Sequence, residues 1–168
     1  MNRTRHKVQR SRVRLRGRIE IQVHEVVARR DARGRFTAGG RKRLARRVVS
    51  ENLVVSGGLT WMCERLRANA LNPISSYQLG TDATAPASGQ AGLLASAYNA
   101  LATKTHVAGS VLTVMLHLGR TQGNGPTYVE GGIFSADGTM LARGTFAGVS
   151  KVNTQTMTIV HALTLSAS

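Results

Sequence analysis

The sequence predicts a mainly β protein, an antiparallel β-sandwich with one short α-helix and a basic extended N-terminal arm. Apolar and polar residues alternate along several segments, which is the two-residue period of half-buried strands. Glycine-bearing turn signals separate these segments at short spacing, as in an all-β domain. Only residues 57–71 show the spacing of a helix. The length of 168 residues suits a single domain, since domains run to about 100–200 residues.

Charge is distributed very unevenly along the chain. The formal net charge is +15, and residues 1–50 hold 17 of the 23 basic residues with three acids, a net charge of +14. Residues 51–168 hold six bases and five acids, a net charge of +1. The sequence therefore predicts a basic N-terminal region joined to a nearly neutral body.

The basic region has the pattern of a strand. From residue 12 the bases occupy even positions while odd positions are mostly apolar, which predicts a strand with one arginine-lined face. A transit peptide would instead be amphipathic at helical period. The sequence 31–34, Asp-Ala-Arg-Gly, predicts a hairpin turn. We therefore divide the chain into a basic arm, residues 1–18, and a single β-sandwich domain, residues 19–168, that includes a basic hairpin region at residues 19–50.

The predicted helix follows this region. Ser56 is a suitable N-cap, and Asn72-Pro73 ends the helix. Its apolar positions predict one buried face, made of Leu59, Met62, Cys63, Leu66 and Ala70. Cys63, the only cysteine, is therefore expected to be a core thiol, and no disulfide within the chain is available to it.

The rest of the body reads as strands and loops. Residues 74–79, 107–118, 127–134, 140–146 and 151–165 are strand-like, and residues 136–138 carry a hairpin signal. Residues 80–90 form a loop rich in small residues, whereas the alanine-rich residues 91–102 fit either a helix or irregular structure.

Signs of catalysis are missing from the sequence. It has no phosphate-binding loop, no nucleophile elbow and no cysteine or histidine cluster at metal-ligand spacing. His117 and His161 lie singly in predicted strands, where we expect half-buried or exposed side chains. The longest apolar runs are shorter than the ~18–20 residues of a membrane span. We therefore expect no enzyme, no catalytic, cofactor-binding or metal-binding residue, and no membrane partner.

The basic arm has two functional interpretations. Its charge suits nucleic acid, but Phe36 is the only aromatic residue among the first 50, so recognition of single strands by base stacking is not supported. Alternatively, arginine forks pair with carboxylates on an acidic protein surface. A solvated tail is a third interpretation, against which the strand-like alternation counts. The candidate partner-binding residues are Arg3, Arg5, Lys7, Arg10, Arg12, Arg14, Arg16, Arg18, Arg41, Lys42, Arg43, Arg46 and Arg47.

Four short motifs follow one another in the body. They are NLVVSGGL at 52–59, YQLGTDATAP at 77–86, EGGIF at 130–134 and ARGTF at 142–146, with Lys151 opening the last strand. In this order they resemble a group of small virion proteins of tailed bacteriophages, over about residues 19–166. The resemblance implies a structural β-sandwich in the virion, assembled in the host cytoplasm. The resemblance further implies that the chain packs against other virion proteins, the major capsid protein or tail proteins, and forms a homo-oligomer.

Within these motifs we expect Glu130 to pair with Arg143 across the following hairpin, with an exposed strand carboxylate as an equal alternative. The expected function is that of a decoration, cement or minor head protein, anchored to acidic surfaces of neighbouring subunits by its arginine-rich region. One alternative is a tail or fibre-adaptor subunit. From another class, the arm suits a module that contacts packaged DNA or RNA.

Overall fold

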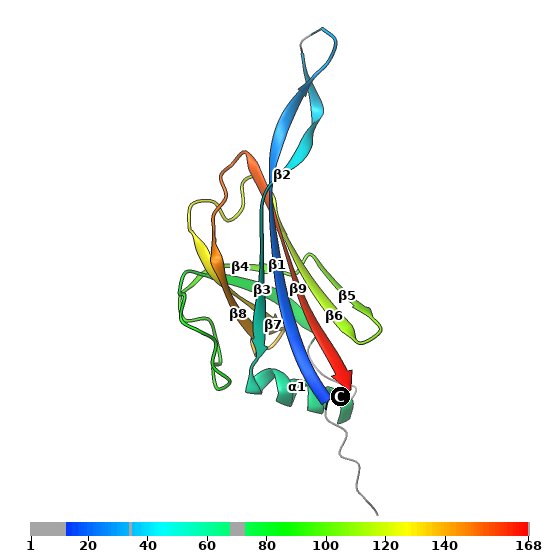
Figure 1. The fold of residues 1–168 in the computed structure, drawn as a ribbon, viewed down its shortest axis with the longest axis vertical. Helices are drawn as coiled ribbons and strands as arrows, with labels where there is room; N and C mark the ends of the chain where they lie inside the picture. The colour runs from blue at the N-terminus through cyan, green and yellow to red at the C-terminus, as the bar shows by residue number, and fades with distance from the viewer. Residues whose placement is uncertain (1–12, 34, 68–72, 168) are drawn as a thin grey trace, which may run out of the picture.

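The structure is a computed structural model that describes residues 13–33, 35–67 and 73–167. Within this part of the chain it contains nine strands and one helix (Figure 1). The elements are β1 (Val13–Arg30), β2 (Phe36–Val54), α1 (Ser56–Arg67), β3 (Ile74–Gly80), β4 (Ser96–Leu101), β5 (Lys104–Ala108), β6 (Val111–Leu118), β7 (Tyr128–Ser135), β8 (Met140–Val149) and β9 (Gln155–Ala167). Residues 1–12 of the predicted arm lie outside the described residues.

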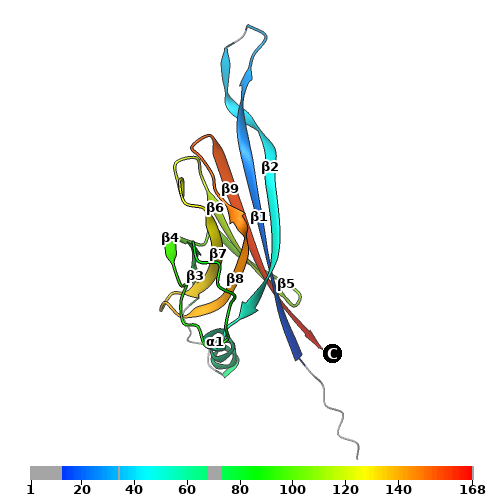
Figure 2. The same ribbon diagram turned by 60° about the vertical axis from the view of Figure 1, so that its left-hand side comes forward.

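All nine described strands belong to one curled antiparallel sheet with the order β4-β3-β7-β8-β2-β1-β9-β6-β5, which forms a half-barrel (Figures 1 and 2). The prediction of a mainly β chain with one short helix is confirmed. Two separate sheets were expected, but β2 joins the two halves. Its 19 residues pair with β1 over most of their length, and Leu53 and Val54 then pair with β8. Alternation along a strand is the same in a sandwich and in a half-barrel, so the sequence did not distinguish them.

Strand β1 confirms the predicted alternation. Ile19, Ile21 and Val23 are buried, whereas Arg16 and Arg18 on the opposite face are exposed. The strand already begins at Val13, which pairs with Ala167 of β9. Residues 13–18 of the predicted arm therefore belong to the sheet.

Strands β1 and β2 form the predicted hairpin, whose outer part extends well beyond the body (Figure 2). The Asp31 carboxylate accepts hydrogen bonds from the backbone N–H groups of Arg33 and Arg35, at 2.9 and 3.0 Å. The Asp31 N–H donates to the Arg35 carbonyl at 2.8 Å. An aspartate that accepts backbone bonds two and four residues further on closes the turn.

The main core fills the concave side of the sheet. It includes Ile19, Tyr77, Leu116, Ile159 and other buried residues from both halves. A second, smaller cluster consists of Val55, which precedes α1, Phe134 of β7 and Met140 of β8, with Leu93 packed against them.

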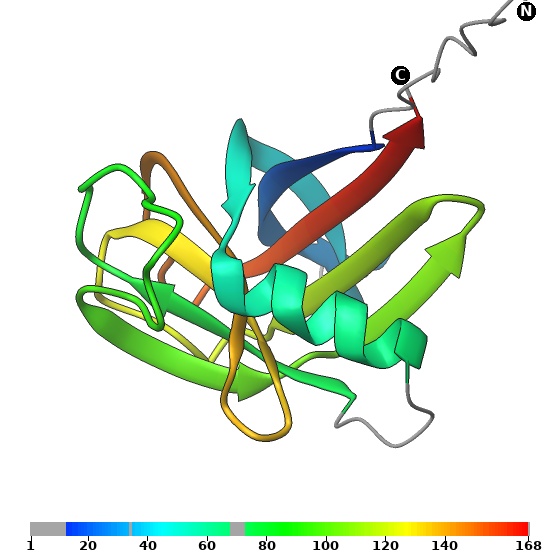
Figure 3. The same cartoon turned by 90° about the horizontal axis from the view of Figure 1, so that it is seen from below.

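Helix α1 lies across one end of the sheet (Figure 3) and packs against β8. Gly58 faces the sheet so closely that a Cβ there would lie 2.1 Å from the Leu141 carbonyl oxygen. With Gly58 inside, the next inward positions are Trp61 and Met62, and both pack on the core. The predicted face was rotated from this one, so the core thiol was wrong: Cys63 is exposed, as is Leu59. Residues 68–72 of the predicted helix lie outside the described residues.

Two other strand assignments differ from the prediction. The alanine-rich segment contains strand β4, and residues 107–118 are split between β5 and β6. Gly109, with φ of +56°, provides the left-handed backbone of the turn between them.

Candidate functional site

Glu130 of β7 and Arg143 of β8 form a fully buried ion pair. The Arg143 Nη2 and Nε atoms lie 2.7 and 2.8 Å from the same oxygen, Oε2 of Glu130. The structure thus brings together the two side chains expected to pair. The alternative of an exposed strand carboxylate was wrong, because Glu130 has no accessible surface.

This pair fixes the long loop between β3 and β4. Glu130 Oε1 accepts a hydrogen bond of 2.9 Å from the Ala95 N–H. Arg143 Nη1 donates to the Thr84 carbonyl oxygen at 3.0 Å and to Gln90 Oε1 at 3.1 Å. Gly80 is required beside the pair, since a Cβ there would lie 2.3 Å from Glu130 Oε1.

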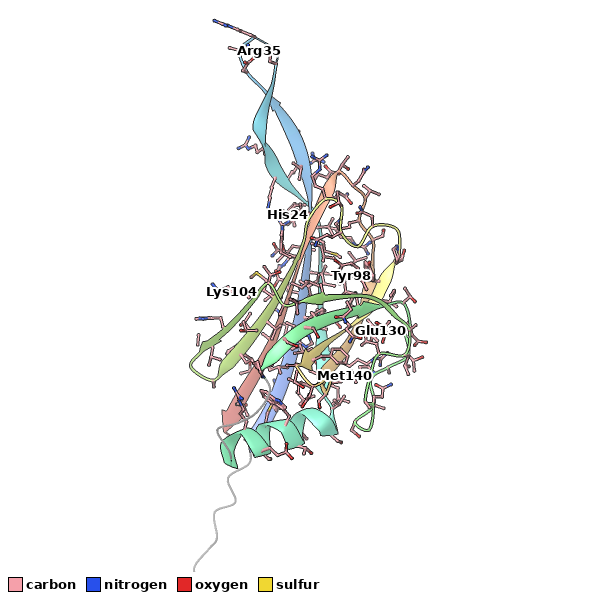
Figure 4. The ribbon with its side chains drawn as sticks, turned by 180° about the vertical axis from the view of Figure 1, so that it is seen from behind. His24, Arg35, Tyr98, Lys104, Glu130 and Met140 are labelled. Atoms are coloured by element: carbon pink, nitrogen blue, oxygen red, sulfur yellow. The ribbon has the colours of Figure 1, made fainter. Side chains whose placement is uncertain are left out.

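The same cluster explains three of the sequence motifs. Gly80 and Thr84 belong to the second motif, Glu130 to the third and Arg143 to the fourth, and all four residues meet at this point in the body (Figure 4 labels Glu130). Both charged side chains are buried, form an ion pair with each other and make hydrogen bonds with the loop between β3 and β4. The cluster therefore has the properties of a structural clamp. Nothing in its geometry provides a nucleophile or an accessible acid.

A second buried polar group lies in the main core. His161 is fully buried, in hydrogen-bond contact with Asn52 Nδ2 and 3.3 Å from the Tyr77 hydroxyl. Burial lowers the pKa of His161 to about 3 and raises the pKa of Tyr77. A half-buried or exposed His161 was therefore the wrong expectation, whereas His117 is half-buried, as expected, with Nδ1 3.0 Å from Thr158 Oγ1.

Lys151 is a buried cation for which we predicted no role from the sequence. Its Nζ donates to the Arg120 carbonyl oxygen at 3.3 Å and to Asn124 Oδ1. Burial lowers the pKa of this ammonium group. The resemblance placed Lys151 at the start of the last strand, but β9 begins only at Gln155 and Lys151 lies in the turn before it. Its bond to a carbonyl group of another loop is visible only in three dimensions.

The exposed arginines and lysine of β1, β2 and the turn between them form what we call the basic surface: Arg16, Arg18, Arg33, Arg35, Arg41, Lys42, Arg43, Arg46 and Arg47. Figure 4 shows Arg35 at the far end of the hairpin and His24 near the level where the hairpin leaves the body. Arg14 lies on β1, but its side chain is outside the described part. The other predicted residues, Arg3, Arg5, Lys7, Arg10 and Arg12, lie outside the described residues.

Three acidic side chains of the hairpin, Glu20, Glu25 and Asp31, are already paired, whereas Glu51 of β2 is exposed opposite Arg18 in the β1–β2 register. Arg47 contacts both oxygens of Glu20, at 2.8 and 2.9 Å, and this hydrogen bonding, with a further bond from Gln22, lowers the pKa of Glu20 to about 2. Arg43 pairs with Glu25 at 3.2 Å. Asp31 at the turn pairs with Arg35 at 3.1 Å.

Other bases of the basic surface have no acidic partner in the described part of the chain. They are Arg16, Arg33, Arg41, Lys42 and Arg46. Their positive charge is therefore unbalanced and faces outward, where it is available to an acidic partner.

Apolar side chains interrupt the charge on the same hairpin. Val27, Leu44 and Val49 are each about half exposed. A nucleic-acid backbone would leave these side chains without apolar contacts and would repel Glu20 and Glu25. A protein surface offers both carboxylates for the arginines and apolar groups for the valines and leucine. The arrangement therefore suits a protein partner better than a phosphate backbone.

No group of three or more histidine, cysteine or acidic side chains suited to a metal ion occurs among the described residues. The one helix in the described part is too short and too polar to cross a membrane. Comparison of the chain with protein-family models, with curated proteins and with solved structures finds no match.

Proposed function

We propose that this chain is a structural protein of a tailed-phage virion, a decoration, cement or minor head protein whose basic surface binds acidic surfaces of neighbouring subunits. The observation that carries the attachment role is the β1–β2 hairpin, which extends beyond the body and presents bases without acidic partners (Figure 2). The assignment to a virion rests on the four ordered sequence motifs, and residues of three of them meet at the buried clamp.

The energetics of the hairpin favour a bound state. A two-stranded hairpin alone is marginally stable in water at best. The last backbone bond from β1 to the body is donated by the Val26 N–H to the Thr154 carbonyl. Beyond it the outer part pairs only with itself, as Val27 with Arg41 and Arg29 with Thr37, and its closely spaced bases repel one another. Carboxylates of a partner relieve this repulsion through charge-assisted hydrogen bonds, and the same contact covers Val27 and Leu44.

The experiment is an incorporation assay with charge-reversed variants. Arg41→Glu/Arg46→Glu is compared with the matched control Arg65→Glu/Arg120→Glu, which makes the same change of charge on the body. Phage particles produced with each variant as the only copy are purified, and the bound protein is quantified. We expect the hairpin variant to lose at least about tenfold in occupancy while its melting temperature stays near that of the control.

Two results would contradict the proposal. Equal occupancy of the hairpin variant and the control would show that the hairpin does not attach the protein. Tight retention of the chain on duplex DNA at ~150 mM salt, lost in the hairpin variant and unchanged in the control, would assign the basic surface to nucleic acid. A tail location, rather than a head location, is distinguished by imaging the bound protein in the particle.

A further inference from the structure

The two ends of the described sheet are not equivalent. Strands β4 and β5 are the terminal strands, so each pairs with a neighbour on one side only. The pairing of β4 with β3 contains a register shift at Leu79 and Gly80. By contrast, β5 pairs with β6 in unbroken register from Lys104 to Ala108. A register shift such as that of β4 discourages pairing with a further strand, whereas a regular terminal strand such as β5 is a template for such pairing.

Strand β5 is also unusually accessible for an edge, and it carries one large apolar side chain, Val107. All five of its residues are exposed. Val107, which lies within the strand, is 66% exposed. Among the large apolar side chains in the described part of the chain, only Leu101 at the end of β4 is more exposed. Figure 1 shows β5 at the outer margin of the fold, with no ribbon beyond it.

We propose that β5 is the interface of a symmetric dimer, in which it pairs antiparallel with β5 of a second copy around a two-fold axis at His106. This is the register in which all five residues of one strand face the five residues of the other. Lys104 then faces Ala108, so the two ammonium groups are kept apart. Thr105 faces Val107, and such β-branched cross-strand pairs stabilise a sheet.

Charge and topology are compatible with this pairing. Strands β9 and β6 separate β5 from β1, so the basic surface lies away from the proposed interface. Residues 51–168, which include β5, carry a net charge of only +1. A two-fold contact uses the same edge of both copies and therefore closes at a dimer. The irregular pairing of β4 at the other end of the sheet disfavours further growth.

The test measures association and register in the purified chain. In sedimentation equilibrium we expect the wild-type chain to dimerise, and Val107→Lys to raise the dissociation constant at least roughly tenfold. Val152→Lys is the matched control, because Val152 is 56% exposed but lies in the turn between β8 and β9. This control should dimerise like the wild type. Both variants alter exposed side chains, and their melting temperatures verify that they fold.

Cysteine variants then test the register, each in a Cys63→Ser background. His106→Cys should form a disulfide-linked dimer on mild oxidation, because the residue faces its own copy, while Val152→Cys should not. A mixture of Thr105→Cys and Val107→Cys chains should cross-link between the two variants more readily than either variant does alone.

A wild-type chain that stays monomeric up to about 0.5 mM would overturn the dimer, as would a dimer that Val107→Lys leaves intact. Equal cross-linking of His106→Cys and Val152→Cys would overturn the proposed register. None of these measurements uses phage particles or the basic surface. Failure of the dimer therefore leaves the attachment role untouched, and failure of the attachment role leaves the dimer untouched.

Discussion

Replacing Arg143 by methionine should destabilise the fold strongly, because the change leaves the Glu130 carboxylate buried without its counter-charge. Both side chains have no accessible surface, and Oε2 of Glu130 lies 2.7 Å from the lost guanidinium. Removing one partner of a buried pair typically costs about 3–5 kcal/mol. In a domain of this size each kcal/mol lowers the melting temperature by about 2–4 °C, so the expected decrease is roughly 6–20 °C.

The double variant Glu130→Met/Arg143→Met provides the control for this reasoning. It removes both charges and fills the same space with apolar atoms, which is often nearly neutral for a buried pair. It also frees Thr84 and Gln90 from Arg143, but Thr84 is exposed and its carbonyl group can bind water instead. The double variant should therefore be more stable than Arg143→Met by about 1–3 kcal/mol.

The assay is urea unfolding followed by circular dichroism, with thermal melting as a second probe. Limited proteolysis should also cut residues 81–95 faster in both variants than in the wild type, since the loop loses its bonds to Arg143. A single variant within about 1 kcal/mol of the wild type would refute the clamp. So would a double variant that is less stable than the single one.

Two further predictions concern other buried positions. Gly80→Ala should destabilise the fold by at least about 2 kcal/mol, since its Cβ would lie 2.3 Å from a buried carboxylate oxygen, whereas Gly89→Ala, with no atom within 4 Å, should be nearly neutral in the same unfolding assay. Because the pKa of His161 is about 3 in the fold and about 6.5 in an unfolded chain, its share of the stability is fully present above about pH 6.5 and is lost as the pH falls toward 3, by about 1.4 kcal/mol per pH unit. His161→Leu should flatten this part of the stability curve, and an unchanged slope between pH 6 and 4 would contradict the assignment.

The sequence predicted those features of the fold that depend on local pattern. The alternation around Ile19 and Ile21 set which face of β1 is buried, and the Asp31 turn set the hairpin. Features that depend on distant contacts were missed. The face of α1 is set by the contact of Gly58 with the Leu141 carbonyl, and no periodicity within the helix contains that contact.

The candidate site could be predicted from the sequence to a similar extent. Glu130 and Arg143 stood out because they are charges within predicted strands, and adjacent antiparallel strands brought them together. The burial of His161 was not foreseeable, because a single polar residue in a strand has the same local pattern whether it faces water or the core. The burial of Lys151 was not foreseeable either, because it depends on the distant loop that contains Arg120. The excess of basic residues was evident from the composition. Only the structure shows which of the neighbouring bases already form ion pairs with carboxylates of the chain.

The contacts of Arg41, Arg43 and Arg46 in a reconstruction of the assembled particle test the proposed attachment most directly. We predict carboxylate groups of neighbouring protein subunits within about 4 Å of these guanidinium groups, with apolar side chains against Val27 and Leu44. Phosphate groups at the same positions, or a hairpin surrounded only by solvent, would contradict the account.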